Sequence, residues 1–371
     1  MISPMSRIVL PGVIFLFALG IRLLYIWQIK DAPLVEVLLI DSNTYDGLAK
    51  RILEGRYQGE EIYAVNVLYP WFLAAVYSIF KIATLPVLVV QVVLDAVNCV
   101  LVLWLGKQLF NLRTGMLAGA LAAIFGPMIF YSGALLTPTL ITFLGLTVLV
   151  LLVQYRSSPK WYVALIVGLI VGLATLARGN NLLLLGAGFL YFASLNRSWK
   201  LILQPTAWML VGAFGVMSFI NVRNYLVERQ FVPISANYAA FYIGHNDEAT
   251  GLYVLPELIE TASFEGEVWG MRDAVSEIVG RPLTLAESAQ FLFQSGVKYA
   301  LTNPGREIEL VARKFYYFWN RTESPTNLNY HFAQDFSWLL RLLPLTFGII
   351  APLALFGMWL TRSEWRKYLQ M

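Results

Sequence analysis

Residues 85–105 read LPVLVVQVVLDAVNCVLVLWL. This run contains a single charge, Asp95, and has the length of an α-helix that crosses a bilayer, which needs about 20 mostly apolar residues. Gln91, Asp95 and Asn98 are spaced i, i+4, i+7 and therefore share one face of that helix. A carboxylate at such depth should face the interior of a helical bundle and have a partner. We predict that its partner is Arg22, which lies at a comparable depth in the first apolar run.

The composition of the whole chain indicates a multi-spanning helical membrane protein. Of its 371 residues, 58% are apolar and only 13% are charged, whereas soluble domains carry about 25% charged residues. The net charge of +4 is spread along the chain, so no nucleic-acid partner is predicted. The single cysteine, Cys99, excludes an internal disulfide. The first apolar run is too long for a signal peptide and is predicted to be a retained anchor.

The sequence contains eight apolar runs that are predicted to span the membrane. A ninth run, 68–80, is too short and is predicted to form an interfacial helix. The fold class predicted is an all-α polytopic membrane protein with interfacial helices in its first outer loop and a small extracytoplasmic segment. The eight predicted spans are residues 8–29, 85–105, 116–131, 135–153, 161–177, 182–195, 207–222 and 338–360.

The distribution of basic residues predicts the orientation. With eight spans, the short connections that carry Lys107, Arg113, Arg156 and Lys160 fall on one side, together with both termini. The positive-inside rule makes that side cytoplasmic, in a plasma (inner) membrane. Counting 68–80 as a span would move Lys107 and Arg113 to the outside.

This orientation divides the chain into a membrane part and two long outer connections. The predicted domains are a bundle over 1–222 that includes the first outer loop, 30–84; an extracytoplasmic segment over 223–337; and a last span with a cytoplasmic tail over 338–371. Because the long connections lie outside, any active site is expected on the extracytoplasmic side.

The first outer loop contains LLIDSNTYDGLAKRILEG, residues 38–55. Its pattern predicts an amphipathic helix over 42–54 that lies on the membrane, with Asp41 or Ser42 as its cap and Gly55 as its stop. Asp46, one turn into the helix, is interpreted as solvated or as a wall of a site.

The second outer connection is predicted to open with turns and short extended pieces. The sequence TLAE at 284–287 is a capping box and predicts a helix that ends near Thr302. A second helix is predicted over about 306–319. In the bundle, the glycines of GLIVG, residues 168–172, are predicted to allow close helix packing.

A few polar residues on the outer side are candidates for chemistry. Arg178 stands alone in the outer turn ATLARGNNL, where it either extends to the lipid headgroups or binds a phosphate. Glu61, beside Glu60, is either in a solvated loop or in the wall of a site. The two histidines, His245 and His331, show no metal-ligand spacing. No cofactor is assigned, although a divalent metal held by oxygen ligands remains open.

Several stretches, in this order and topology, resemble a known family. The chain is similar to the type C membrane glycosyltransferases, in particular to bacterial proteins related to protein O-mannosyltransferases and to the lipid A aminoarabinose transferase. The matching stretches are IDSNTYDGLAKRILEG (40–55), LYPWFLAAVYSIF (68–80), VVQVVLD (89–95), GPMIFYSGALLTPTL (126–140), GLATLARGNNLLLL (172–185) and RNYLVERQFVPISANYAAFYIGHNDEATGLYV (223–254).

The resemblance implies a reaction and its site. Such proteins transfer a sugar from a polyprenyl-phosphate carrier to a protein, lipid or glycan acceptor at the outer face. The resemblance implies that Asp41 deprotonates or positions the acceptor and that Arg178 holds the lipid phosphate. One base and one phosphate-binding cation suffice for an inverting displacement. Further substrate-binding candidates are Tyr45, Glu61, Tyr69, Arg223, His245 and Asn246.

Two departures from the family pattern keep other functions open. Thr137 and Pro138 stand where many relatives have an acidic residue in the second outer loop. Leu68 and Tyr69 precede Pro70 where a basic residue is frequent. The alternatives are a lipid or solute transporter or flippase, which predicts internal repeats and polar residues in several spans, and an inactive glycosyltransferase-like subunit.

Overall fold

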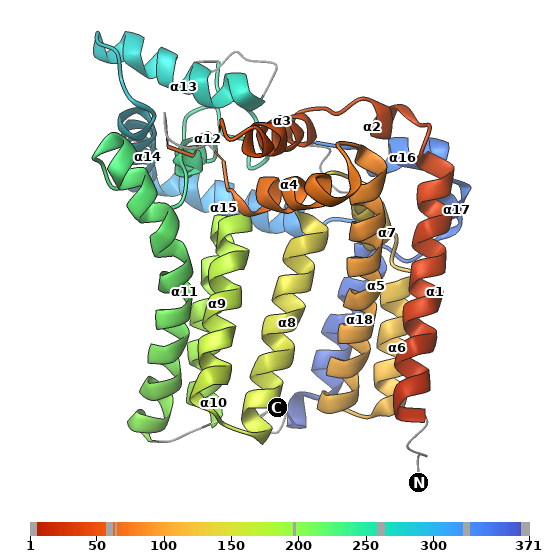
Figure 1. Cartoon of the computed structure of the whole chain (residues 1–371). Helices are drawn as coiled ribbons and strands as arrows, with labels where there is room; N and C mark the ends of the chain where they lie inside the picture. The colour runs from red at the N-terminus through yellow and green to blue at the C-terminus, as the bar shows by residue number, and fades with distance from the viewer. Residues whose placement is uncertain are drawn as a thin grey trace.

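The computed structural model describes residues 6–56, 62–63, 65–195, 198–257, 264–321 and 327–364. Over these residues the secondary structure is helical, with no β-strand among them. Figure 1 shows a bundle of roughly parallel helices with a layer of shorter helices across one end. We call this the capped end; α3 and α4 cover part of it, and α1 begins at the opposite end.

The bundle helices are those expected of a multi-pass membrane protein, because apolar side chains face outward as well as inward. Four of them are long and apolar enough to cross a membrane, and a bent pair counts as a fifth if it is one broken span. The other bundle helices are shorter but run alongside, so the count of eight spans stays a prediction. The long helices are α1 (Ser6–Ile29), α5 (Thr84–Leu109), α8 (Pro138–Ser157) and α11 (Trp199–Glu228); the others are α6 (Leu112–Ala123), α7 (Gly126–Ser132), α9 (Trp161–Ala177), α10 (Leu183–Leu195) and α18 (Phe347–Leu360).

Two predicted spans are interrupted. The run 116–131 forms α6 and then α7, which are bent by 54°. Pro127 stands in the first turn of α7 and disfavours helical geometry in the residue before it. The run 338–360 forms α17 (Trp338–Leu342), an irregular piece that contains Pro344, and then α18. Each of these two predicted spans therefore contains two helices, and whether each crosses the membrane as one broken span stays a prediction.

The predicted domain boundary after residue 222 falls inside α11, which continues to Glu228. The division of the chain into domains stays a prediction.

Small residues set the closest contact in the bundle, between α9 and α11. An added Cβ at Gly168 would lie 1.9 Å from the carbonyl oxygen of Met209, and one at Gly172 would lie 2.8 Å from that of Ala213. Gly212 of α11 approaches Leu165 of α9 in the same way. The predicted packing role of the GLIVG stretch is confirmed.

The predicted pair in the membrane interior is also confirmed. The Arg22 Nε donates to Asp95 Oδ2 at 2.6 Å, and both side chains are buried. The same guanidinium also donates to the carbonyl oxygens of Ala18, Ala122 and Ala123. The charge of Asp95 is thus neutralised and the donors of Arg22 are used within the bundle.

At the capped end, two short helices lie across the bundle (Figure 1). Helix α3 (Asp41–Leu53) and helix α4 (Leu68–Phe80) match the predicted interfacial helices, and a short helix, α2 (Pro33–Glu36), precedes them. Gly55 follows α3 with φ +70, as its predicted stopping role requires.

Asp46 joins the two interfacial helices. It accepts a hydrogen bond from the Tyr77 hydroxyl at 2.7 Å and forms an ion pair with Lys50 at 2.6 Å. Asp46 is also buried. Its interpretation as a solvated residue or a site wall was wrong, because it is buried and its hydrogen bond from Tyr77 ties α3 to α4.

The second outer segment is mostly helical and also lies at the capped end. The predicted capping box is present at Thr284 and Glu287. Bends, turns and irregular stretches occur at its opening, over residues 229–235 and 244–257, beside the short helices η2 and α12, and helix α13 was not predicted. The elements are η2 (Ala236–Ala239), α12 (Ala240–Ile243), α13 (Phe264–Val279), α14 (Leu285–Thr302), α15 (Pro304–Phe318) and α16 (Tyr330–Phe336); η1 (Gly179–Leu182) links α9 to α10, and η3 (Arg362–Glu364) follows α18.

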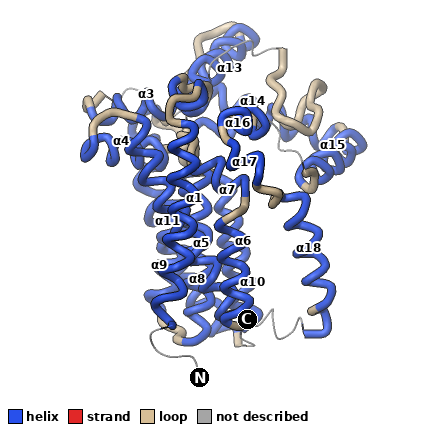
Figure 2. Tube along the Cα trace, turned by 90° about the vertical axis from the view of Figure 1, so that its right-hand side faces the viewer, coloured by secondary structure: helices blue, strands red, loops and turns tan. Residues whose placement is uncertain are grey.

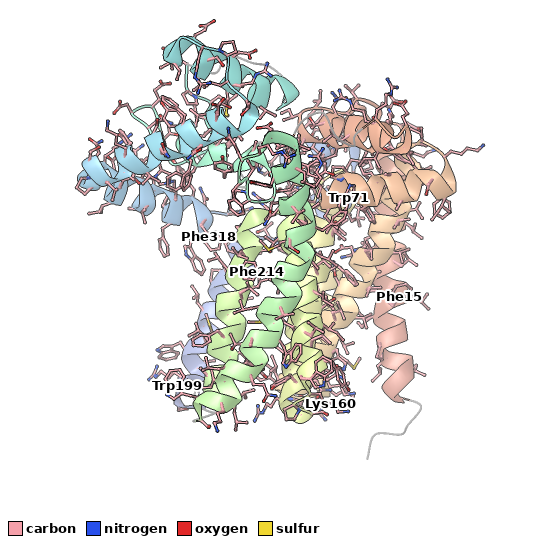
Figure 3. All side chains as sticks on the ribbon, turned by 60° about the vertical axis from the view of Figure 1, so that its left-hand side comes forward. Phe15, Trp71, Lys160, Trp199, Phe214 and Phe318 are labelled. Atoms are coloured by element: carbon pink, nitrogen blue, oxygen red, sulfur yellow. The ribbon has the colours of Figure 1, made fainter. Side chains whose placement is uncertain are left out.

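Two further views place the remaining parts. Figure 2 shows α18 standing apart from the other bundle helices, with α15 near its upper end. Figure 3 shows Lys160 and Trp199 at the end of the bundle opposite the capped end.

Candidate functional site

A cavity of about 450 Å³ lies at the capped end. Its walls come from segments that are far apart in the sequence: the start of α3, the segment before α4, the connection from α7 to α8, the turn after α9, and the chain between α15 and α16. The lining residues that could contact a polar ligand are Asp41, Tyr45, Asn66, Tyr131, Thr137, Arg178, Asn237, Tyr253 and Asn327.

Asp41 is the first residue of α3, but its carboxylate does not cap that helix. The N-cap position is Ile40, and no side chain caps the first turn, so the predicted capping by Asp41 or Ser42 is wrong. Ile40 has φ 48 and ψ −120, a strained backbone conformation for a β-branched residue. This strained residue directly precedes the carboxylate in the cavity.

Asn327 holds Asp41 through a reciprocal pair of hydrogen bonds. The Asn327 Nδ2 donates to Asp41 Oδ2 at 2.8 Å, and the backbone N–H of Asp41 donates to Asn327 Oδ1 at 3.3 Å. The two residues are 286 positions apart in the chain. The second outer segment therefore fixes the side chain and the backbone of a residue in the first outer loop.

The surroundings of Asp41 raise the pKa of its carboxyl group above the usual value. Burial is the largest cause, while the hydrogen bond from Asn327 and the positive charge of Arg178 act in the opposite direction. The pKa of the Tyr45 hydroxyl is also raised, first by burial and then by the charge of Asp41. Tyr45 is thus a neutral hydrogen-bond donor beside a carboxylate of raised basicity.

Arg178 lies in the turn that follows α9, where its backbone is well fixed. Its N–H donates to the Ala174 carbonyl, and its own carbonyl accepts from the backbone and the side chain of Asn181 at 3.0 Å each. The side chain is exposed. Among the described residues, no carboxylate forms an ion pair with the guanidinium. Arg178 therefore presents its donors where the cavity opens.

Thr137 and Pro138 form the wall that the second outer loop contributes. The cavity consequently has a hydroxyl and a proline ring at the position where the sequence departs from the family pattern. Asp41 is the single carboxylate among the described residues that line the cavity.

Three asparagines, Asn66, Asn237 and Asn327, were missed by the sequence reasoning. Asn66 accepts a hydrogen bond from the Ser235 hydroxyl at 3.1 Å, which joins the segment before α4 to the second outer segment. An isolated asparagine in a loop has no distinguishing pattern, so one sequence held no signal for them.

Two predicted binding residues, Tyr69 and Arg223, do not line the cavity. Tyr69 is buried, packs edge-on against Tyr45 at 5.1 Å and donates to Gln91 Oε1 at 2.5 Å. Arg223 lies over the Tyr63 ring at 4.0 Å. Tyr69 thus supports the wall at Tyr45, and the predicted substrate contact of Arg223 is not found in this cavity.

Two others belong to a different cluster. The His245 Nδ1 lies 2.8 Å from Glu307 Oε2, and its ring stacks on Phe241. The Asn246 amide donates to the carbonyls of Tyr242 and Ile243, so it stabilises a turn. Neither residue lines the cavity, and their predicted substrate contact is not found there. Glu61 lies outside the described residues.

The described residues also test the open question of a divalent metal. Nowhere among them do three His, Cys, Asp or Glu side chains come together. We assign no metal to the cavity from this part of the chain.

Residues 65–223 match the family described as dolichyl-phosphate-mannose-protein mannosyltransferase. The chain resembles the type C membrane glycosyltransferases. This confirms the resemblance found in the sequence and places it in the membrane part, from the segment before α4 into α11. Arg178 lies inside the matched segment, whereas Asp41 and Asn327 lie outside it.

Among solved structures, the chain is similar to the apo crystal structure of the Archaeoglobus fulgidus oligosaccharyltransferase. The identity is 13%, the TM-score is 0.48, and the similarity covers 94% of this chain and 56% of the other. The chain therefore spans little more than half of that protein's length. A comparison with curated protein sequences finds no match.

Proposed function

We propose that this protein transfers a sugar from a polyprenyl-phosphate-linked donor to an acceptor at the extracytoplasmic face of the membrane. One observation carries the proposal. Asp41 and Arg178, which are far apart in the sequence, line one cavity at the capped end. That end is the extracytoplasmic one in the orientation predicted from the basic residues.

In this reaction Asp41 is the general base. A base must be able to take a proton near neutral pH, and burial raises the pKa of Asp41 in that direction. The hydrogen bond that Asn327 Nδ2 donates keeps the carboxylate in place while it accepts the proton of the acceptor hydroxyl.

Arg178 binds the phosphate of the donor. A planar guanidinium gives two parallel hydrogen bonds to phosphate oxygens, and it stabilises the charge that develops on a phosphate leaving group. Its exposed position in the turn suits a headgroup that arrives within the outer leaflet. A phosphate leaving group needs no protonation, so one carboxylate suffices and we propose inversion at the sugar carbon.

The transporter alternative gains no support from the polar residues of the second span. Asp95 pairs with Arg22 and accepts from Asn98, while Gln91 donates to the carbonyls of Ser132 and Ala134. Asp95 and Gln91 are thus satisfied inside the bundle, as a structural role requires, whereas the buried Asn98 Oδ1 has no hydrogen-bond partner among the described residues.

The experiment that tests the proposal uses the purified protein with a panel of polyprenyl-phosphate sugars and a broad acceptor set. Asp41→Asn should lower the rate by about 10²–10⁴-fold, the usual contribution of a general base. Arg178→Ala should lower the rate by about 10²–10³-fold, mainly because the variant uses the donor less well. Arg281→Ala, which removes an exposed arginine of the outer segment, is the matched control and should leave the rate unchanged.

Stability separates loss of chemistry from loss of fold. The raised pKa of Asp41 means that its charged form is disfavoured in the folded protein, so Asp41→Asn should melt at or above the wild-type temperature at neutral pH. Full activity of Asp41→Asn would overturn its role as the base. If the Arg178→Ala variant depended on the donor as the wild type does, Arg178 would be assigned to a contact with lipid headgroups instead.

A further inference from the structure

Helix α15 has an apolar face that no part of the described chain covers. Ile308, Val311, Phe315 and Phe318 are spaced i, i+3, i+7, i+10 and therefore form one stripe along the helix. Their side chains are 73%, 59%, 66% and 68% exposed, respectively. Exposing four large apolar side chains in one stripe to water costs considerable free energy.

The two other faces of α15 are accounted for. Leu310 is fully buried, and Lys314 donates to the Gly244 carbonyl, so this face packs on the outer segment. Arg306 and Arg313 both pair with Glu309 at 2.6 Å and form an exposed charged face. The charged face lies on the other side of the helix from Phe315. Three faces with three environments are typical of an amphipathic helix at a boundary.

The position of α15 indicates which boundary this is. In Figures 1 and 2, the helix lies crosswise to the bundle at the level of the capped ends of the membrane helices. Figure 3 shows Phe318 below the α15 ribbon, toward the bundle. The level and direction are those of the interface between headgroups and acyl chains.

The apolar face is also continuous with a surface that the membrane covers. The rings of Phe318 and Trp319 pack against Phe347 at 6.1 and 6.0 Å between centroids. Phe347 is the first residue of α18, whose Ile349, Leu353 and Phe356 are exposed along an apolar helix. The bilayer that surrounds α18 therefore reaches the end of α15.

We propose that α15 is an interfacial helix whose apolar face is inserted in the leaflet at the capped end. The aromatic residues near its end suit this depth, because tyrosine and tryptophan concentrate at membrane interfaces. The occupant of the face is lipid, not a second copy of the chain. The helix anchors the second outer segment to the membrane, and this role is independent of the proposed sugar transfer.

The test measures the environment of a spin label on each face of α15. The full-length protein, with Cys99→Ser to remove its one native thiol, is labelled at Phe315→Cys and reconstituted in phosphatidylethanolamine–phosphatidylglycerol nanodiscs. Arg313→Cys, on the charged face, is the matched control for water, and Phe356→Cys of α18 is the control for lipid. Collision rates with oxygen and with a polar nickel chelate are compared.

We expect the Phe315 label to favour oxygen over nickel, as the Phe356 label does, and the Arg313 label to show the reversed preference. A Phe315 label that favours nickel would show a face in water and would overturn the proposal. A label that neither reagent reaches would show a protein contact and would also overturn it; loss of that protection on dilution in lipid would identify a second copy. Ile308→Cys repeats the measurement on the same face if Phe315→Cys expresses poorly.

Discussion

At the scale of single residues, the proposed base depends on a partner that the sequence did not reveal. Asp41 has a carboxyl group whose pKa is raised by burial, and the hydrogen bond from Asn327 limits that rise. Asn327 touches Asp41 and lines the cavity, so in the proposed reaction it is a positioning residue. Its effect should be visible in the pH dependence of transfer.

Asn327→Ala should shift the acidic limb of the kcat/KM profile to higher pH. Activity is lost as the pH falls through the pKa of Asp41, because the base must be deprotonated. Removing a donor that lowers this pKa raises it further, and a hydrogen bond to a charged group of about 1.5–3 kcal/mol predicts a shift of at least about one pH unit. Gln294→Ala, which removes an exposed amide of α14, should leave the profile in place. A rate loss with an unmoved limb would mean that Asn327 acts only on the fold.

The buried pair in the bundle supports a second prediction at this scale. Arg22→Leu or Asp95→Leu alone should be strongly destabilising, by about 3–5 kcal/mol, because each leaves an unpaired charge. The double substitution should be less destabilised than either single one in thermal unfolding. Exchange of the two charges should not restore stability, since Arg22 also donates to three carbonyls of α1 and α6. If the double variant lost as much stability as the two single variants together, the prediction that Arg22 and Asp95 stabilise each other would be wrong.

The sequence allowed the prediction of those site residues whose charge is unusual at their position near or within the membrane. Asp41 after a span, Arg178 in an outer turn and Asp95 inside a helix are conspicuous, because charges near or within a membrane are costly. Asn66, Asn237 and Asn327 are ordinary loop residues, and only the folded chain brings them to the cavity. Tyr69 and His245 illustrate the opposite error: they are in the matching stretches, yet their side chains are used in packing and in a separate charged cluster.

At the scale of elements, some helix boundaries followed capping residues and prolines, whereas α3 begins without a side-chain cap and α11 continues through Pro205. The capping box at Thr284 predicted the start of α14, and the short apolar run predicted α4 over the observed residues. The breaks within the runs 116–131 and 338–360 were not predicted, because these runs were identified by their apolar composition alone. Pro127 and Pro344 carried the signal for the breaks, which hydropathy alone does not show.

The contact between α9 and α11 yields a paired prediction. Gly168→Ala should lower the thermal stability in nanodiscs, because its Cβ would overlap the Met209 carbonyl and force the helices apart at a cost of about 1–3 kcal/mol. Gly215→Ala on α11 makes the same chemical change, but its Cβ would meet no atom within 4 Å. Equal melting temperatures for the two variants would refute close packing at Gly168.

At the scale of the whole molecule, the arrangement of charges agrees with one orientation. Lys160 lies at the end of the bundle opposite the cavity (Figure 3), and α18 ends at that same end (Figure 1). The positive-inside rule predicts that this end is cytoplasmic. The number of helices that cross the bilayer depends on α9, α10 and α18, which are short, so orientation is the quantity to measure.

Reporter fusions test this orientation directly. A green fluorescent protein at the C-terminus should fluoresce, and alkaline phosphatase fused after Glu257 in the second outer segment should be active, because that enzyme needs an oxidising compartment. The same phosphatase fused after Ser158, between α8 and α9, is the matched control and should be inactive. The reversed pattern would place the cavity in the cytoplasm and would remove the basis for an extracytoplasmic reaction.

The bond between Asp41 and Asn327 also concerns how the protein is made. Asp41 leaves the ribosome early, and its partner follows 286 residues later, after the bundle helices up to α11 and most of the second outer segment. During synthesis Asp41 therefore lacks its partner until those helices and that segment have been made. A product truncated before residue 327 carries both Asp41 and Arg178 but lacks the residue that holds the base, so the site is complete only once Asn327 has been made.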